Sequence, residues 1–175
     1  MRSRSLVPAL ALALASLAAC DGDSTEPLAD VQLSIRDNCD PATFNAALGA
    51  GTCTGAGTMT LAQFNSELNS THSVAAWNFD PATLTVRVGQ RIAARNNGGE
   101  THTFTEVEDF GGGIVPALNT ASGNTAVAPE CQSLPAGAMI AAGATFLNEE
   151  EEVAGSEKYQ CCIHPWMRAN VTVTN

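Results

Sequence analysis

The sequence predicts an all-β fold, a Greek-key β-sandwich with one short helix and an N-terminal extension. Three observations indicate this class. Short segments alternate apolar and polar residues, as strands with one buried face do. Glycines and asparagine–glycine pairs separate these segments, as turns do. Only residues 60–70 carry apolar side chains at helical spacing. Short strands divided by turns are typical of a β-sandwich.

The elements can be expected in chain order. The expected strands are residues 31–36, 83–89, 91–96, 102–107 and 169–175. The expected helix, residues 60–70, has Thr60 as a candidate N-cap, and Leu61, Phe64 and Leu68 share one of its faces.

Two further stretches are expected to be irregular. Residues 106–145 are rich in glycine, alanine, proline and serine, and we interpret them as a long connection with one strand near residues 138–141. The acidic run at 148–152 is expected to be a solvated turn or strand edge, where charge discourages edge-to-edge pairing.

The first residues resemble an export signal. Arg2 and Arg4 precede an uncharged, mostly apolar run from Leu6 to Ala19, shorter than the about 20 residues that a membrane helix needs. The run ends in LAAC, which resembles the Leu-x-x-Cys signal of bacterial lipoproteins, so we expect cleavage before Cys20 and lipidation of Cys20. The alternative is an ordinary signal in which this cysteine is incidental.

These features define an expected domain organisation. It consists of a signal peptide at 1–19, a flexible tether at 20–29 and a single domain at 30–175, divided into an extension at 31–76 and a core at 77–175. The mature protein is therefore expected in the cell envelope or periplasm, attached to a membrane by its lipid. The chain has 8 Lys and Arg against 18 Asp and Glu, a charge that disfavours nucleic acid and suits either a basic protein partner or simply solubility.

The segment YQCCIHPWM, residues 159–167, contains candidate metal ligands. Cys161, His164 and Met167 follow the spacing C-x2-H-x2-M, and a thiolate, an imidazole and a thioether form a soft ligand set that favours copper. Upstream, GGETHTFT supplies His102. Two histidines and one cysteine with a weak axial methionine are typical of blue-copper sites.

On these residues the chain resembles the cupredoxin family of type 1 copper proteins, with loops similar to those of amicyanin and pseudoazurin. The resemblance covers residues 77–105 and 157–173. Its matching positions are Phe79, Pro81, Val86, Gly89, Asn96, His102, Tyr159, Cys161, His164, Pro165 and Met167. It implies one type 1 copper ion held by His102, Cys161, His164 and Met167.

The resemblance also implies how the protein works. Single electrons would pass between redox protein partners through an exposed edge of His164, surrounded by an apolar patch of Pro165 and Trp166. Two positions depart from the family pattern. Thr103 stands where members often carry an asparagine that ties the two ligand loops together, and Cys162 stands where serine or threonine is common.

The other cysteines are disulfide candidates. Cys39 and Cys53 bracket a short loop, so we expect a disulfide between them, with two buried free thiols as the alternative. Cys161 has the spacing of the ligand, whereas its neighbour Cys162 points to the opposite face of an extended strand. Cys131 then remains as the expected partner of Cys162, although connectivity cannot be read from sequence alone.

Three other functions compete with electron transfer. Copper storage or delivery at the cell surface would use the same ligands. An enzyme with a Cys–His nucleophile would leave Met167 and His102 without a role, so we expect no enzymatic activity. A purely structural surface lipoprotein would not need an intact ligand set.

Overall fold

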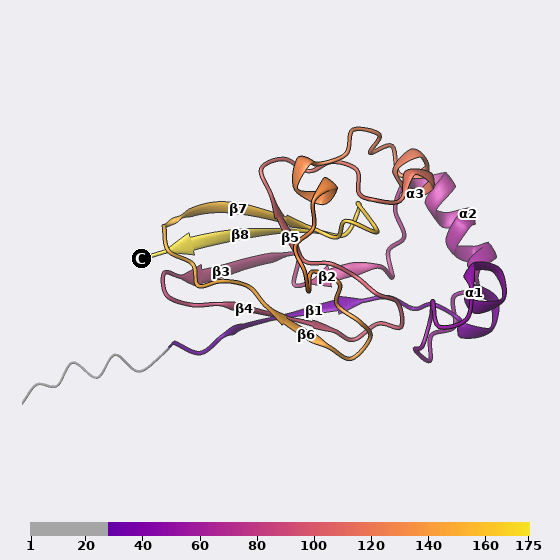
Figure 1. The fold of residues 1–175 in the computed structure, drawn as a ribbon, viewed down its shortest axis with the longest axis horizontal. Coiled ribbons are helices and arrows are strands. Elements are labelled where there is room, and N and C mark those ends of the chain that lie inside the picture. The colour runs from indigo at the N-terminus through magenta and orange to yellow at the C-terminus, as the bar shows by residue number, and fades with distance from the viewer. Residues whose placement is uncertain (1–27) are drawn as a thin grey trace, which may run out of the picture.

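The computed structural model describes residues 28–175, which form a sandwich of two four-stranded sheets (Figure 1). The all-β sandwich predicted from the sequence is confirmed. Within the described residues no helix is long and apolar enough to cross a membrane. The expected signal peptide, the lipidated Cys20 and most of the tether lie outside the described residues, so they stay predictions.

The first sheet has the strand order β2-β1-β4-β6. Its strands are β1 (Val31–Arg36), β2 (Asn78–Asp80), β4 (Ile92–Asn96) and β6 (Thr145–Leu147). Strand β1 pairs in parallel with β4 and antiparallel with β2, so it lies inside the sheet. The expected boundary between an extension at 31–76 and a core at 77–175 is therefore not a structural one. The first strand belongs to the sandwich, and the rest of the expected extension, residues 37–76, follows it.

The second sheet has the order β3-β8-β7-β5. Its strands are β3 (Thr83–Arg87), β5 (Thr105–Val107), β7 (Gly155–Gln160) and β8 (Arg168–Thr174). The strand expected at 102–107 forms only over its last three residues, because His102 makes a single bridge outside the sheet. Strand β7 was not predicted, because its burial changes along its length instead of alternating.

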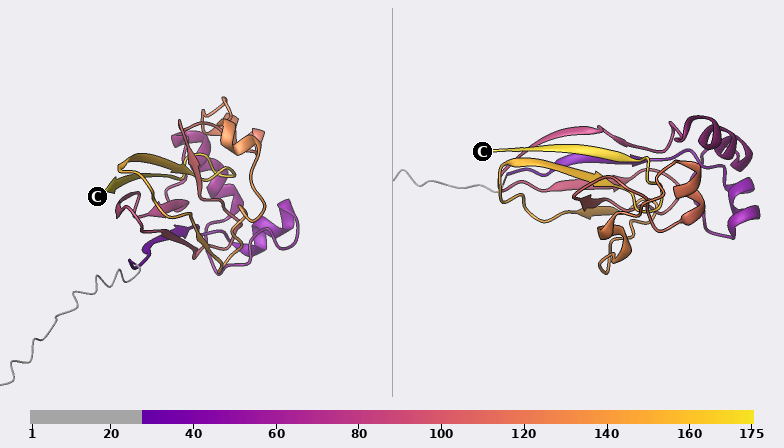
Figure 2. Two further views of the ribbon diagram at one scale, coloured as in Figure 1. Left: turned by 60° about the vertical axis from the view of Figure 1, so that its left-hand side comes forward. Right: turned by 90° about the horizontal axis from the view of Figure 1, so that it is seen from above.

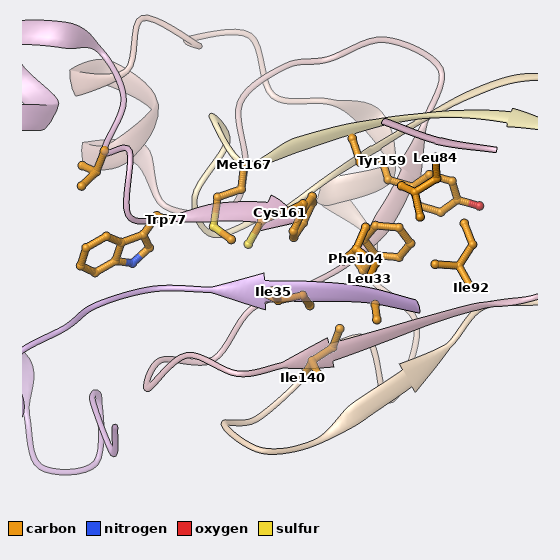
Figure 3. Packing of buried hydrophobic residues seen from close by; sticks show 14 of the residues in the cluster. Leu33, Ile35, Trp77, Leu84, Ile92, Phe104, Ile140, Tyr159, Cys161 and Met167 are labelled. Carbon is orange, nitrogen blue, oxygen red and sulfur yellow. The ribbon is translucent and has the colours of Figure 1, made fainter. Parts of the chain in front are cut away.

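Apolar side chains from both sheets fill the space between them (Figure 3). In β1, Leu33 and Ile35 face inward, as the alternation predicted. The rings of Phe104, just before β5, and Tyr159, in the neighbouring strand β7, stack within the core with centroids 4.3 Å apart. This packing fixes the strand ends from which the candidate ligands project.

Two helices cover the end of the sandwich opposite the C-terminus (Figures 1 and 2). Helix α2 (Leu61–Thr71) begins after a Thr60–Gln63 capping box, which confirms the expected helix. Helix α1 (Pro41–Leu48) was missed: it lies inside the loop between Cys39 and Cys53, and the signal was an Asp40 cap followed by proline.

The long connection before β6 is more ordered than expected. It contains helix α3 (Pro116–Ala121) and the 3₁₀ turn η1 (Pro129–Gln132). The strand expected near 138–141 is wrong, because only Ile140 pairs, in a single bridge with His102.

The acidic run at 148–152 is only partly solvated. Glu151 is buried, which corrects the expectation of an exposed run. Its backbone pairs with that of Gly89 and Gln90, and this pairing turns the side chain toward Asn148 and Tyr159.

Candidate metal centre

Three candidate ligand atoms converge inside the sandwich. The Sγ atom of Cys161 lies 3.7 Å from Nδ1 of His102 and 3.9 Å from Nδ1 of His164. An ion held at about 2.0 Å by nitrogen and about 2.3 Å by sulfur permits N–S separations up to about 4.3 Å. Both pairs therefore fit ligands of one ion. Cys161 and His102 are 0% exposed and His164 is 3% exposed.

A short loop between β7 and β8 supplies three of the four predicted ligands. The loop closes on itself: the N–H of Cys161 donates to the carbonyl of Met167 at 3.0 Å, and the N–H of Met167 donates to the carbonyl of His164 at 2.9 Å. Met167 is buried, and in Figure 3 its side chain and that of Cys161 extend into the same part of the interior. The structure thus brings the short-range motif together in one buried loop.

The environment of Cys161 favours a thiolate. Burial raises its pKa, but hydrogen bonds with His102 and His164 outweigh that effect and hold the pKa well below its ordinary value. The backbone N–H groups of Thr103 and His164 also approach Sγ, at 3.4 and 3.5 Å. Because the thiolate is the form that binds metals, the site is prepared for an ion.

Thr103 joins the two ligand loops. Its hydroxyl oxygen accepts a hydrogen bond from the N–H of Cys162 at 2.8 Å, and its own N–H points at Cys161. The threonine is fully buried. The departure from the family pattern at this position therefore keeps a tie between the loops, made by a hydroxyl in place of an amide.

Asp37, which the sequence did not indicate as a site residue, holds His102. The Nε2–H of His102 donates to Oδ2 of Asp37 at 2.9 Å, and the imidazole presents Nδ1 to Cys161. Burial raises the pKa of Asp37, but the hydrogen bond from His102 and two backbone N–H donors outweigh it and lower the pKa to about 2.

The pKa of the His102 imidazole shifts in the complementary direction. Burial lowers the pKa of His102, but its hydrogen bonds with Asp37 and Cys161 outweigh burial and raise the pKa to about 9. No local signal could have revealed Asp37, because 65 positions separate it from His102 in the chain.

Two glycines permit the segment that contains Asp37 to approach His102. A Cβ on Gly98 would lie 2.0 Å from Oδ2 of Asp37, and a Cβ on Gly99 would lie 2.7 Å from Sγ of Cys39. The NNGGE segment, residues 96–100, which the sequence marks only as a turn, is therefore also the place where the segment that follows β1 approaches the site.

His164 faces a second carboxylate. Its Nε2 lies 3.5 Å from Oε2 of Glu100, and that oxygen accepts a hydrogen bond from the indole N–H of Trp77 at 2.7 Å. Burial raises the pKa of Glu100. Glu100 and His164 line a surface hollow of about 200 Å³, which is completed by Gly51, Thr52, Thr101 and Ile163.

The expected electron port is not open in this structure. His164 is 3% exposed, and Pro165 is buried. Trp166 is half-buried between His164, at a ring-centroid distance of 5.5 Å, and Phe64, at 5.9 Å. Phe64 of helix α2 thus packs against Trp166, one of the two residues of the apolar patch expected around the port.

The four cysteines named as disulfide candidates form two disulfides. Cys39 pairs with Cys53, and Cys131 pairs with Cys162. Among the described cysteines, Cys161 alone is unpaired. The adjacent thiols thus have separate roles, one at the centre of the ligand set and one in a disulfide beside it.

The known proteins that match this chain are solved structures. No protein-family model matches the sequence, and no curated protein matches it. A purple cupredoxin from Nitrosopumilus maritimus is 18% identical, with 83% of this chain and 100% of that chain covered and a TM-score of 0.46. Plastocyanin from Dryopteris crassirhizoma is 13% identical, covering 82% and 100%, with a TM-score of 0.42.

A solved amicyanin mutant in the Cu(I) state is 22% identical. The match covers 58% of this chain and 77% of the amicyanin chain, with a TM-score of 0.38. All three TM-scores lie below 0.5, so the assignment of a function depends on the geometry of the site itself.

Proposed function

We propose that this protein binds one copper ion in a type 1 site and transfers single electrons between redox proteins. The observation that carries the proposal is the buried thiol of Cys161 between the Nδ1 atoms of His102 and His164. A thiolate with two imidazoles is a soft donor set that suits copper, and the thioether of Met167 can add a weak axial contact. Bound copper would supply a one-electron change between Cu(II) and Cu(I).

The rigidity of the ligands favours electron transfer over copper storage or delivery. Asp37 fixes the ring of His102, Thr103 ties the two loops, and the loop from Cys161 to Met167 is closed by its own backbone. Ligands that are already in place need little rearrangement when the charge of the ion changes. A delivery protein must release its ion, and ligands with 0 to 3% exposure hinder release.

Burial also argues against nucleophilic catalysis. A nucleophile must reach its substrate within about 3–3.5 Å. Sγ of Cys161 is enclosed by Thr103, His102 and His164, and the residue is 0% exposed. A lowered thiol pKa at such a position is explained by metal binding more directly than by attack on a substrate.

The decisive experiment is a visible spectrum of the purified protein with Cu(II). The wild-type protein should show the intense blue band of a thiolate–copper bond. Cys161→Ser should abolish it, because a hydroxyl cannot replace the thiolate. The matched control is Cys162→Ser, which should keep the band but lose roughly 2–5 kcal/mol of stability with its disulfide. A colourless wild-type protein with stoichiometric Cu(II) and reduced Cys161 would refute the type 1 assignment.

The axial role of Met167 can be tested separately. Met167→Leu should keep the copper and raise the reduction potential, since loss of a weak donor leaves Cu(II) less stabilised relative to Cu(I). Voltammetry on both proteins measures this shift. An unchanged or lowered potential would assign the axial position to another group.

We further propose that the protein is exported and held at a membrane through Cys20. Two disulfides among the described residues are consistent with an oxidising compartment. Metabolic labelling with a radioactive fatty acid tests the anchor, with Cys20→Ser as the control. Equal labelling of both proteins would contradict this part of the proposal.

A further inference from the structure

We propose that Asp37 and Glu100 are positioning residues of the metal centre, whose buried carboxylates hold the remote nitrogens of both ligand imidazoles and bias bound copper toward Cu(II). This inference rests on the copper assignment proposed above. It gives the segment between β1 and α1, where Asp37 lies, a direct part in setting the redox properties of the site.

The first carboxylate is fully enclosed and fully bonded. The side chains of Asp37 and His102 are 1% and 0% exposed. Oδ1 of Asp37 accepts from the N–H groups of Cys39 and Gly99, at 3.2 and 2.9 Å. Its Oδ2 accepts from the N–H of Glu100 and from Nε2–H of His102, both at 2.9 Å. Four N–H donors on two oxygens stabilise an anion at this position.

The second carboxylate makes a looser contact. Glu100 is 8% exposed at its side chain, and its Oε2 lies 3.5 Å from Nε2 of His164. The indole N–H of Trp77 donates to the same oxygen and aims it at the imidazole. Glu100 also borders the surface hollow described above, so solvent screens its charge more than that of Asp37.

The arrangement favours the more positive ion. A carboxylate that accepts the remote N–H of a ligating histidine fixes the tautomer and makes the imidazole a stronger donor. Inside a protein, charges also act more strongly than in water. Reduction adds one electron from a partner, breaks no bond and leaves both Nε2–H protons on the imidazoles. Each nearby anion therefore opposes the electron, and the reduction potential falls.

A structural role alone would leave the potential unchanged, so the potential is the discriminating measurement. Copper-loaded Asp37→Asn and Glu100→Gln should be equilibrated with a redox mediator of known potential. For Asp37→Asn the Cu(I)/Cu(II) ratio should rise at least tenfold, which is about 59 mV for one electron. Glu100→Gln should shift in the same direction by less.

Asp109→Asn serves as the matched control for loss of one negative charge. The side chain of Asp109 is 87% exposed, so its removal should change the ratio less than twofold. Asp37→Glu keeps the charge and should restore most of the wild-type ratio.

The wild-type protein offers a second measurement, in case Asp37→Asn fails to fold. In the Cu(I) state, ¹H–¹⁵N spectra should show His102 protonated at Nε2, with a slowly exchanging proton. Protonation at Nδ1 instead would overturn the proposal. So would copper-loaded Asp37→Asn that keeps the blue band with an unchanged or lower Cu(I)/Cu(II) ratio. A wild-type protein that never turns blue refutes the copper assignment instead, so the two failures are distinguishable.

Discussion

The two ends of the sandwich bury carboxylates in opposite ways. At the helix-covered end, Asp37 receives N–H donors on both oxygens, and its pKa is lowered to about 2. At the other end, near the C-terminus, Glu151 and Glu157 crowd around the hydroxyl of Tyr159. There, burial and the hydrogen bond with Glu151 raise the pKa of Glu157 to about 7.

The difference shows what burial of an acid requires. Converging N–H groups offset the loss of hydration at Asp37, whereas a neighbouring acid adds repulsion at Glu157. The candidate metal centre therefore lies at the end where the buried carboxylate, Asp37, has enough N–H donors. At the opposite end, the carboxylate of Glu157 has no such N–H donor among the described residues. Four predictions test this contrast and the loop tie beside the metal centre, beginning with the largest effect.

Replacing Asp37, the carboxylate that receives N–H donors on both oxygens, should lower the stability of the protein. Asp37→Ala in the metal-free protein removes one partner of a buried pair and leaves His102 and three backbone N–H groups without an acceptor. We expect a loss of about 3–5 kcal/mol in the free energy of unfolding, measured by urea denaturation. Asp109→Ala, which removes an exposed acid paired with Lys158, should change stability by at most about 1 kcal/mol.

The same residue should determine behaviour in acid. Because the pKa of Asp37 is lowered from 3.8 to about 2 in the folded protein, its contribution is fully present above about pH 4. It is lost as the pH falls from there toward 2. The stability of Asp37→Ala should consequently change less over this window than that of the wild type. Parallel curves for the two proteins would contradict the assigned pairing.

The tie between the ligand loops should have a smaller effect. Thr103→Ala leaves the buried N–H of Cys162 without its acceptor, and an unsatisfied buried donor costs about 1–3 kcal/mol. Thr103→Ser keeps the hydroxyl and is the control. Thermal unfolding compares them, and the band of the copper-loaded protein should broaden in the alanine variant alone. Equal stability of the two variants would show that the hydroxyl contributes nothing.

Glu157, at the end near the C-terminus, should have the smallest effect on stability, and its pH dependence should be opposite to that of Asp37. The raised pKa of Glu157 means that the folded state binds more protons than the unfolded state between pH 4.5 and about 7. Stability should fall as the pH rises through this window. Solvent screening limits the change to below about 1 kcal/mol, and Glu157→Gln should remove it. Denaturation at pH 5 and pH 8 measures it, and a wild-type protein that gains stability at pH 8 would reverse the sign.

The sequence predicted the parts of this protein whose signals are local. The loop from Cys161 to Met167 could be identified because its ligands lie within seven positions, and β3 and β8 because their burial alternates. Helix α2 could be identified from the helical spacing of Leu61, Phe64 and Leu68 after a candidate N-cap at Thr60. In each case one short segment contains all the necessary information.

The remaining features depend on contacts between distant segments. Nothing around Asp37 indicates that it will meet His102, and the same is true of Trp77 and Glu100. The coverage of Trp166 by Phe64 could not be predicted either, because it depends on how helix α2 docks. The closed port and the paired carboxylates therefore had to come from the three-dimensional structure.

The parallel pairing of β3 with β8 has a consequence for folding. It aligns Thr83 with Asn170, so the chain must close a very long loop before these strands can meet. Folds dominated by such distant pairings typically fold in milliseconds to seconds. Until then, Cys161 and Cys162 are adjacent free thiols, and either can be oxidised with Cys131. A disulfide formed between Cys131 and Cys161 before the sheet closes would consume the candidate metal-binding thiol.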